Sequence, residues 1–110
     1  MYSHAVVTYL KILQGKVYKL LPMRESYDRG DINYLYEYID YLKSTYTGAL
    51  VLYPELCSNK SVIEVGNNIA YLLTEKDIPF EKWRAIVFKS TRLVQRVLDK
   101  CREGCVYGKS

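Results

Sequence analysis

The chain has 110 residues, 49% apolar and 25% charged, which is the composition of a globular protein and the length of a single domain spanning residues 1–110. It contains no run near the roughly 18 apolar residues of a membrane span and no secretory signal, so we expect neither membrane insertion nor secretion. The net charge of +4 comes from the second half. Residues 1–55 carry six basic and six acidic side chains, whereas residues 56–110 carry ten and six.

The first predicted helix covers residues 3–21. Its apolar residues recur at alternating steps of four and three, which places them on one helical face. Pro22 is expected to end the helix, and the polar residues after it are expected to form a turn. The face consists of Val6, Leu10, Leu13, Val17 and Leu20.

The second predicted helix covers residues 32–53. Asp31 is expected to cap its start because a carboxylate accepts hydrogen bonds from the first free amides, and Pro54 is expected to end it. The three-four spacing continues without a break along this segment. The apolar face consists of Ile32, Leu35, Ile39, Leu42, Tyr46, Ala49 and Tyr53.

The third predicted helix, residues 61–74, is the shortest. Ser61 and Glu64 have the spacing of a capping box, in which each side chain accepts a hydrogen bond from the other residue's backbone amide. The following segment around Pro79 is expected to turn the chain into the last helix. The apolar face consists of Val62, Val65, Ile69 and Leu72.

The fourth predicted helix, residues 80–103, has the most regular apolar face of the chain. Gly104 suits a helix C-cap, so residues 105–110 are expected to fray. The face consists of Trp83, Ile86, Val87, Ser90, Leu93, Val94, Val97, Leu98 and Cys101.

These patterns predict an all-α protein, specifically a small antiparallel four-helix bundle. Each predicted helix has one apolar face, and the connections between helices are short. Packing the four faces inward would bury all of them in one core.

Few residues of this chain could carry catalysis or hold a metal. The chain has a single histidine, His4, which makes a histidine-dependent catalytic triad or a metal site with several histidines improbable. Cys57, Cys101 and Cys105, with His4, could form a zinc site, but their spacing does not match a zinc motif and reduced thiols are the simpler interpretation. We therefore expect no enzyme activity, no metal and no cofactor, in a reduced, cytoplasmic protein.

A stripe of tyrosines on the second predicted helix is a candidate interaction surface. Tyr34, Tyr38 and Tyr41 either contact a partner, as tyrosine often does at interfaces, or form the flank of the buried face. Phe88 lies opposite the main apolar face of its helix, so an exposed position would extend a contact surface. The leading hypothesis is a non-enzymatic adaptor, inhibitor or assembly subunit that binds another protein, or itself.

A row of basic residues along the last predicted helix gives the alternative hypothesis. Positive charges at intervals of one or two helical turns could follow a nucleic-acid backbone, although a solvated basic surface is the simpler interpretation. The row consists of Lys82, Lys89, Arg92, Arg96 and Lys100.

Overall fold

The computed structural model describes residues 2–25, 32–75 and 77–108, and the side chains within 2–24, 33–75 and 77–101. It is all-α, as predicted, and the described residues contain no strand. The elements, in chain order, are α1 (His4–Tyr18), α2 (Leu20–Glu25), α3 (Ile32–Leu52), the 3-10 helix η2 (Pro54–Ser58), α4 (Lys60–Thr74) and α5 (Phe80–Gly108).

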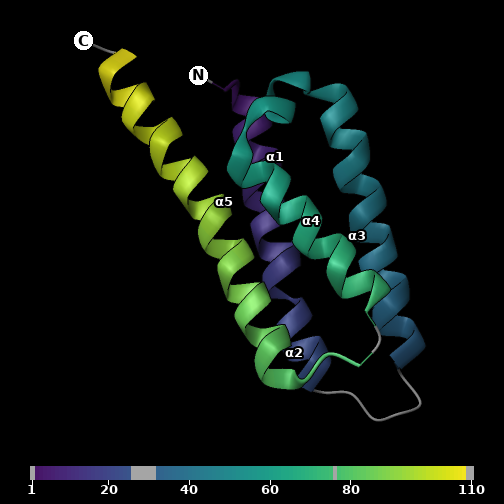
Figure 1. Ribbon diagram of the computed structural model, residues 1–110. Coiled ribbons are helices and arrows are strands. Elements are labelled where there is room, and N and C mark those ends of the chain that lie inside the picture. Colours follow the sequence, from purple (N-terminus) through teal and green to yellow (C-terminus); the bar gives the residue numbers. More distant parts are fainter. Residues whose placement is uncertain (1, 26–31, 76, 109–110) are drawn as a thin grey trace.

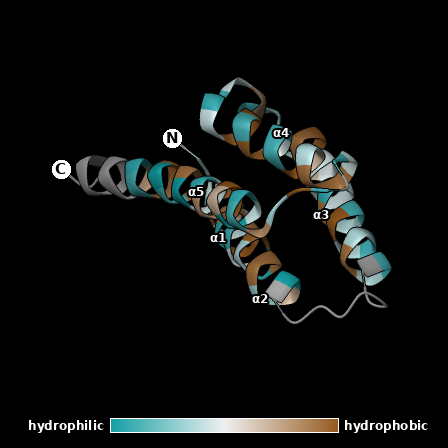
Figure 2. Cartoon of the chain, turned by 60° about the horizontal axis from the view of Figure 1, so that its bottom comes forward, coloured by the Kyte–Doolittle hydropathy of each residue, from teal (hydrophilic) through white to brown (hydrophobic). Residues whose placement is uncertain are grey.

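The longest helix, α5, packs along both α1 and α4, and α4 in turn packs against α3 (Figure 1). A narrower contact joins α1 to α3, and the short helix α2 lies against α5 and α3. The first long helix of the chain therefore packs mainly on the last one. Hydropathy colouring shows apolar and polar stripes along the helices (Figure 2). No helix among the described residues is both long and apolar enough to cross a membrane.

The predicted apolar faces form one buried core, with contributions from every long helix. Residues buried almost completely come from α1, α2, α3, α4 and α5 alike, because each helix turns its three-four stripe toward its neighbours. Ile86 and Tyr53 are only partly buried, at the edge of the core, and the predicted Ile32 lies outside the described side chains. The largest fully buried side chains include Leu10, Leu13, Leu20, Leu35, Ile39, Leu42, Leu56, Ile69, Leu72 and Trp83.

Polar side chains link α5 to its two neighbours. The Gln14 side-chain amide on α1 donates to the Thr91 carbonyl at 3.1 Å and to the Gln95 side-chain oxygen at 3.0 Å. On the other side, the Asn68 amide donates to the Oγ of the buried Ser90 at 3.0 Å. Since an unpaired buried hydroxyl is costly, these bonds favour one register of α5 against α1 and α4.

The first predicted helix, 3–21, is divided in two. The helix α1 ends at Tyr18, α2 begins at Leu20, and Lys19 between them stays in the right-handed helical region. Pro22 does not end the helix, contrary to the prediction, because it is the third residue of α2. A first-turn amide has no intrahelical acceptor, so a proline there removes no hydrogen bond.

The start of α4 differs from the predicted capping box. Asn59 is the N-cap, and its Oδ1 accepts from the amides of Ser61 at 3.0 Å and Val62 at 3.2 Å. The box with Ser61 and Glu64 was therefore wrong, and the Glu64 carboxylate instead pairs with Lys89 across the α4–α5 contact. The 3-10 turn before Asn59 was not predicted from the sequence.

The last helix runs further than the sequence suggested. Gly104 was expected to cap it, but α5 continues to Gly108, and no described glycine has the positive φ that a glycine C-cap uses. The expected frayed tail was thus wrong for residues 105–108, while 109–110 lie outside the described residues. The expected N-cap at Asp31 also lies outside them.

Candidate binding surfaces

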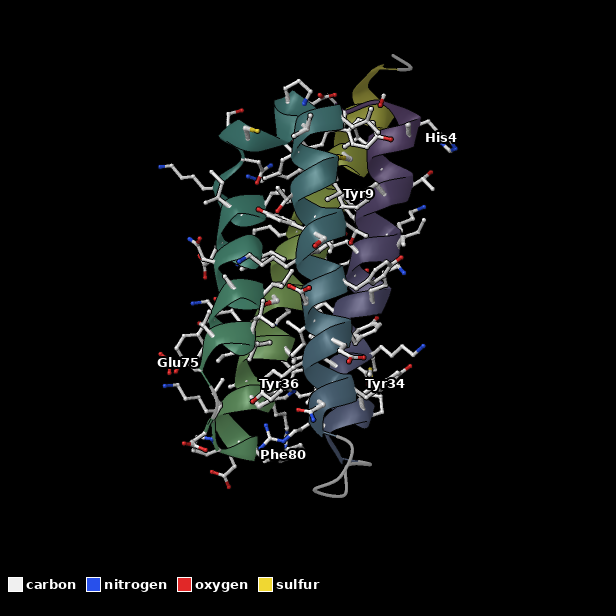
Figure 3. All side chains as sticks on the ribbon, turned by 90° about the vertical axis from the view of Figure 1, so that its right-hand side faces the viewer. His4, Tyr9, Tyr34, Tyr36, Glu75 and Phe80 are labelled. Atoms are coloured by element: carbon white, nitrogen blue, oxygen red, sulfur yellow. The ribbon has the colours of Figure 1, made fainter. Side chains whose placement is uncertain are left out.

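The three predicted tyrosines lie on the side of α3 that meets α1, but they do not share one environment. Tyr34 and Tyr41 are 65% and 53% exposed, and Tyr34 is visible at the lower end of α3 beside α1 (Figure 3). Tyr38 is half-buried, and its hydroxyl donates to the Lys16 carbonyl of α1 at 3.1 Å. Burial raises the pKa of Tyr38, and the neighbouring Tyr41 and Tyr34 raise it further. Tyr38 thus joins the two helices, while Tyr34 and Tyr41 face solvent.

Two aliphatic side chains extend this exposed surface. Ile12 on α1 is 51% exposed and Leu52 on α3 is 68% exposed. Leu52 follows Tyr41 by eleven residues, about three helical turns, so it lies on the same side of α3. We call Ile12, Tyr34, Tyr41 and Leu52 the α1–α3 face. Ile12 was missed in the sequence, although its position off the apolar face of its helix was a visible signal.

Charged groups lie within and beside the α1–α3 face. The Lys16 ammonium sits 5.2 Å from the centre of the Tyr41 ring, a cation–π contact. The exposed Glu37 lies one helical turn from both Tyr34 and Tyr41. The face therefore presents aromatic surface with a positive charge on the α1 side and a negative charge on α3.

Phe88 does not belong to the α1–α3 face. Its ring is half-buried, with the Tyr18 ring 6.4 Å away and the Arg84 guanidinium 5.6 Å above it. Tyr18 and Lys16 are two residues apart, so they project from nearly opposite sides of α1. Phe88 therefore lies at the α1–α5 contact, away from the tyrosines of α3.

Three of the five predicted basic residues gather at an open groove between α4 and α5. Lys89, Arg92 and Arg96 line it together with Ala85, Leu93 and Glu64, and its volume is about 500 Å³. The Lys89 ammonium lies 3.0 Å from the Glu64 carboxylate. We call this the α4–α5 groove.

The other two basic residues lie beyond the ends of the α4–α5 groove. The Lys82 ammonium sits 5.1 Å from the centre of the Tyr71 ring, and its hydrogen bond with Tyr71 raises the pKa of Lys82. Lys100 lines a separate pocket of about 330 Å³, together with Tyr2, Asn59, Val97 and Cys101. Of the five predicted basic residues, only Lys89, Arg92 and Arg96 therefore face the groove.

The cysteines considered for a zinc site do not come together in the part of the chain that the structure describes. Cys57 is exposed at η2, whereas Cys101 is buried on α5. No group of three or more histidine, cysteine, aspartate or glutamate side chains able to hold a metal occurs among the described residues. The Cys105 side chain lies outside them.

A buried tyrosine hydroxyl between α1 and α3 leads to a prediction about stability. Tyr9 lies between α1 and α3 (Figure 3). Its hydroxyl, near the Tyr53 ring, is buried without a hydrogen-bond partner. Burial, and then the nearby Tyr46, raise the pKa of Tyr9 to about 12 from 10.0. We expect Tyr9→Phe to raise the free energy of unfolding by up to about 1 kcal/mol at neutral pH, because it removes an unpaired buried hydroxyl.

The same variant should also change the response to alkali. Because the folded-state pKa lies above the unfolded value, ionisation of Tyr9 leaves the free energy of unfolding unchanged below pH 10 and lowers it as pH rises toward 12. Tyr9→Phe should therefore unfold at higher pH than the wild type in a circular-dichroism titration. Tyr46→Phe, which loses a hydrogen bond to the Val62 carbonyl, is the control and should be destabilising. A destabilised Tyr9→Phe protein would show that the hydroxyl has a partner.

No family model matches the chain, and comparisons with curated proteins and with solved structures find no significant similarity.

Proposed function

We propose that the chain is a non-enzymatic protein-interaction module, an adaptor, inhibitor or assembly subunit, that binds another protein through the α1–α3 face. The observation that supports this most directly is the exposure of Tyr34 and Tyr41 on either side of the anchored Tyr38. Fixing the middle tyrosine to the Lys16 carbonyl holds α3 against α1, so the two outer rings are presented on a rigid support. A rigid aromatic surface loses little conformational entropy on binding.

The chemistry of the face favours a helical partner segment with apolar residues and at least one basic side chain. From Tyr34 to Leu52 the exposed stripe of α3 is about 27 Å long, enough for several turns of a partner helix. Apolar groups of the partner would cover Tyr34, Tyr41 and Ile12, and a basic side chain would meet Glu37. A second copy of this chain offers such a segment, since α1 itself carries Ile12 and Lys16 next to each other.

The proposal includes the arrangement of the scaffold and its compartment. We infer that α1, α3, α4 and α5 form an antiparallel four-helix bundle, supported by the contacts of α5 with α1 and α4 and of α3 with α4. A reducing, cytoplasmic environment is supported by Cys57, an exposed cysteine with a free thiol.

The test is a double variant that removes the two exposed rings and keeps Tyr38. We expect Tyr34→Ser/Tyr41→Ser to abolish association, because truncating central aromatic residues of an interface commonly costs 2 kcal/mol or more, about thirtyfold in affinity. Light scattering against protein concentration detects a second copy, and cross-linking in host cells followed by mass spectrometry detects a different protein.

Tyr18→Ser is the matched control, because Tyr18 is 51% exposed but lies on the α1–α5 side. Association should survive in this variant. A monomeric wild type whose cross-linked proteins are the same in Tyr34→Ser/Tyr41→Ser would contradict the proposal.

We propose nucleic-acid binding through the basic row of α5 as a second candidate function. The observation that favours it is the gathering of Lys89, Arg92 and Arg96 around one groove. Binding through phosphates would weaken steeply with salt, so affinity measured over a salt series tests it.

A further inference from the structure

The α4–α5 groove has features that specify one kind of anionic ligand. Its α5 wall carries Lys89, Arg92 and Arg96, and among the described side chains the one carboxylate that lines it is Glu64 on α4. We propose that this groove holds the phosphodiester backbone of single-stranded nucleic acid, and that a phosphate displaces Glu64 from Lys89 on binding. This inference rests on the second candidate function. It places the binding site in the α4–α5 groove and identifies Glu64 as the group that competes with the phosphate for Lys89.

The charge balance of the groove favours a polyanion. The other nearby carboxylate, Asp99, accepts a hydrogen bond from the Gln95 amide at 2.8 Å, and Gln95 in turn accepts one from Gln14 on α1. Asp99 is thus held toward the α1 side of α5, away from α4. Three cations against one carboxylate leave an uncompensated positive charge in the groove.

The spacing of the cations suits a chain of phosphates rather than a single anion. Arg92 and Arg96 are one turn apart, about 6 Å along the helix, and Lys89 to Arg96 spans about 10 Å. Lys82 and Lys100 continue the row to about 27 Å. The other two residues that line the groove, Ala85 and Leu93, are apolar, so sugars can lie against them.

The shape of the groove favours a single strand over a duplex. It is a furrow between two packed helices, with basic groups on one wall and Glu64 on the other. One backbone can lie along the furrow. A rigid duplex is too wide to enter the furrow and would rest on its rims, where its phosphates lie farther from the basic wall and are attracted less.

The ion pair between Glu64 and Lys89 can open, so that a phosphate takes the place of the Glu64 carboxylate. Both side chains are open to solvent, 42% and 65% exposed, and an ion pair in such a setting contributes little to stability. A phosphate can therefore replace the carboxylate on Lys89 at little cost to the fold. Glu64 then remains in the groove as a like charge that weakens binding.

The experiment measures binding to the full chain by fluorescence anisotropy over a series of salt concentrations. The labelled probes are a single-stranded oligothymidylate, the corresponding oligouridylate RNA, and a DNA duplex of the same length. Arg92→Gln/Arg96→Gln should weaken single-strand binding at least about tenfold and flatten the logarithmic salt slope by about 1.4, from two lost phosphate contacts. Glu64→Gln should tighten binding about threefold, because it removes one like charge.

Lys19→Gln/Lys43→Gln is the matched control, since it removes the same charge from exposed sites elsewhere. It should change affinity less than twofold, and circular dichroism should show all variants folded. If the two double variants lose affinity for the single strand equally, or if Glu64→Gln does not gain affinity, the groove is not the binding site, although the protein still binds nucleic acid. Tighter binding of the duplex, or displacement of the strand by polyglutamate at a lower concentration than by unlabelled DNA, would also overturn it. No binding at low salt would overturn the site and the second candidate function together.

Discussion

Replacing Trp83 with alanine is expected to lower the free energy of unfolding by about 3–5 kcal/mol. The side chain is completely buried at the end of the molecule where α2 meets α5. Its indole nitrogen donates to the Leu20 carbonyl at 3.3 Å, and the Arg24 guanidinium lies 5.0 Å from the ring centre. The substitution leaves a large cavity and removes this hydrogen bond, a large loss for a fold whose total stability is about 5–15 kcal/mol.

Urea unfolding followed by circular dichroism measures this effect, since the variant lacks the chain's single tryptophan and with it the fluorescence signal. Trp83→Phe keeps an aromatic ring but not the hydrogen bond, so its loss should be intermediate. Arg24→Met removes the cation and its hydrogen bond to the Ile78 carbonyl while Trp83 stays in place. Of the three variants, it should lower the free energy of unfolding least. A loss below about 1 kcal/mol for Trp83→Ala would mean that α2 does not pack on α5 as described.

Replacing Gly66 with alanine is expected to cost about 2–3 kcal/mol. A Cβ atom at this position of α4 would overlap the hydroxyl end of the Tyr46 ring on α3. The ring cannot turn aside freely, because it is buried and its hydroxyl donates to the Val62 carbonyl at 2.8 Å. Relief of the overlap would therefore either break this hydrogen bond or separate α3 from α4.

Gly48→Ala is the matched control, because a Cβ there meets no atom within 4 Å and the position is helical. It should stabilise the protein by about 0.5–1 kcal/mol, the usual difference between the two residues in a helix. Thermal unfolding of both variants distinguishes the two effects, because Gly48→Ala changes helix propensity alone and Gly66→Ala also introduces the overlap with Tyr46. Adding Tyr46→Leu to Gly66→Ala should recover part of the loss, and strict additivity of the two changes would contradict the contact.

The buried faces of the helices could be predicted from the sequence because helical periodicity alone determines them. Val6, Leu10, Leu13 and Val17 repeat at steps that fit 3.6 residues per turn, and the structure confirms that all four are buried. The same holds for Val62, Val65, Ile69 and Leu72 on α4. Helix ends were less predictable, because Pro22 and Gly104 are compatible with either an end or a continuation.

The contacts between helices could not be predicted, because they depend on how distant segments pack. The overlap that excludes a side chain at Gly66 arises from Tyr46, twenty residues earlier. For the candidate sites, the spacing of residues in the sequence identified the tyrosines and the basic row. It could not predict that Tyr38 is anchored while Tyr34 and Tyr41 are exposed. That difference depends on the Lys16 carbonyl of another helix.

The packing of α1 on α5 has a consequence for protein synthesis. The side chain of Gln14 bonds to residues about eighty positions later in the chain, so the apolar face of α1 lacks its main cover until α5 has been made. During translation the early segments would leave the ribosome with this face open, available to chaperones or to aggregation. Completion of the fold would then follow emergence of the last helix rather than proceed stepwise from the N-terminus.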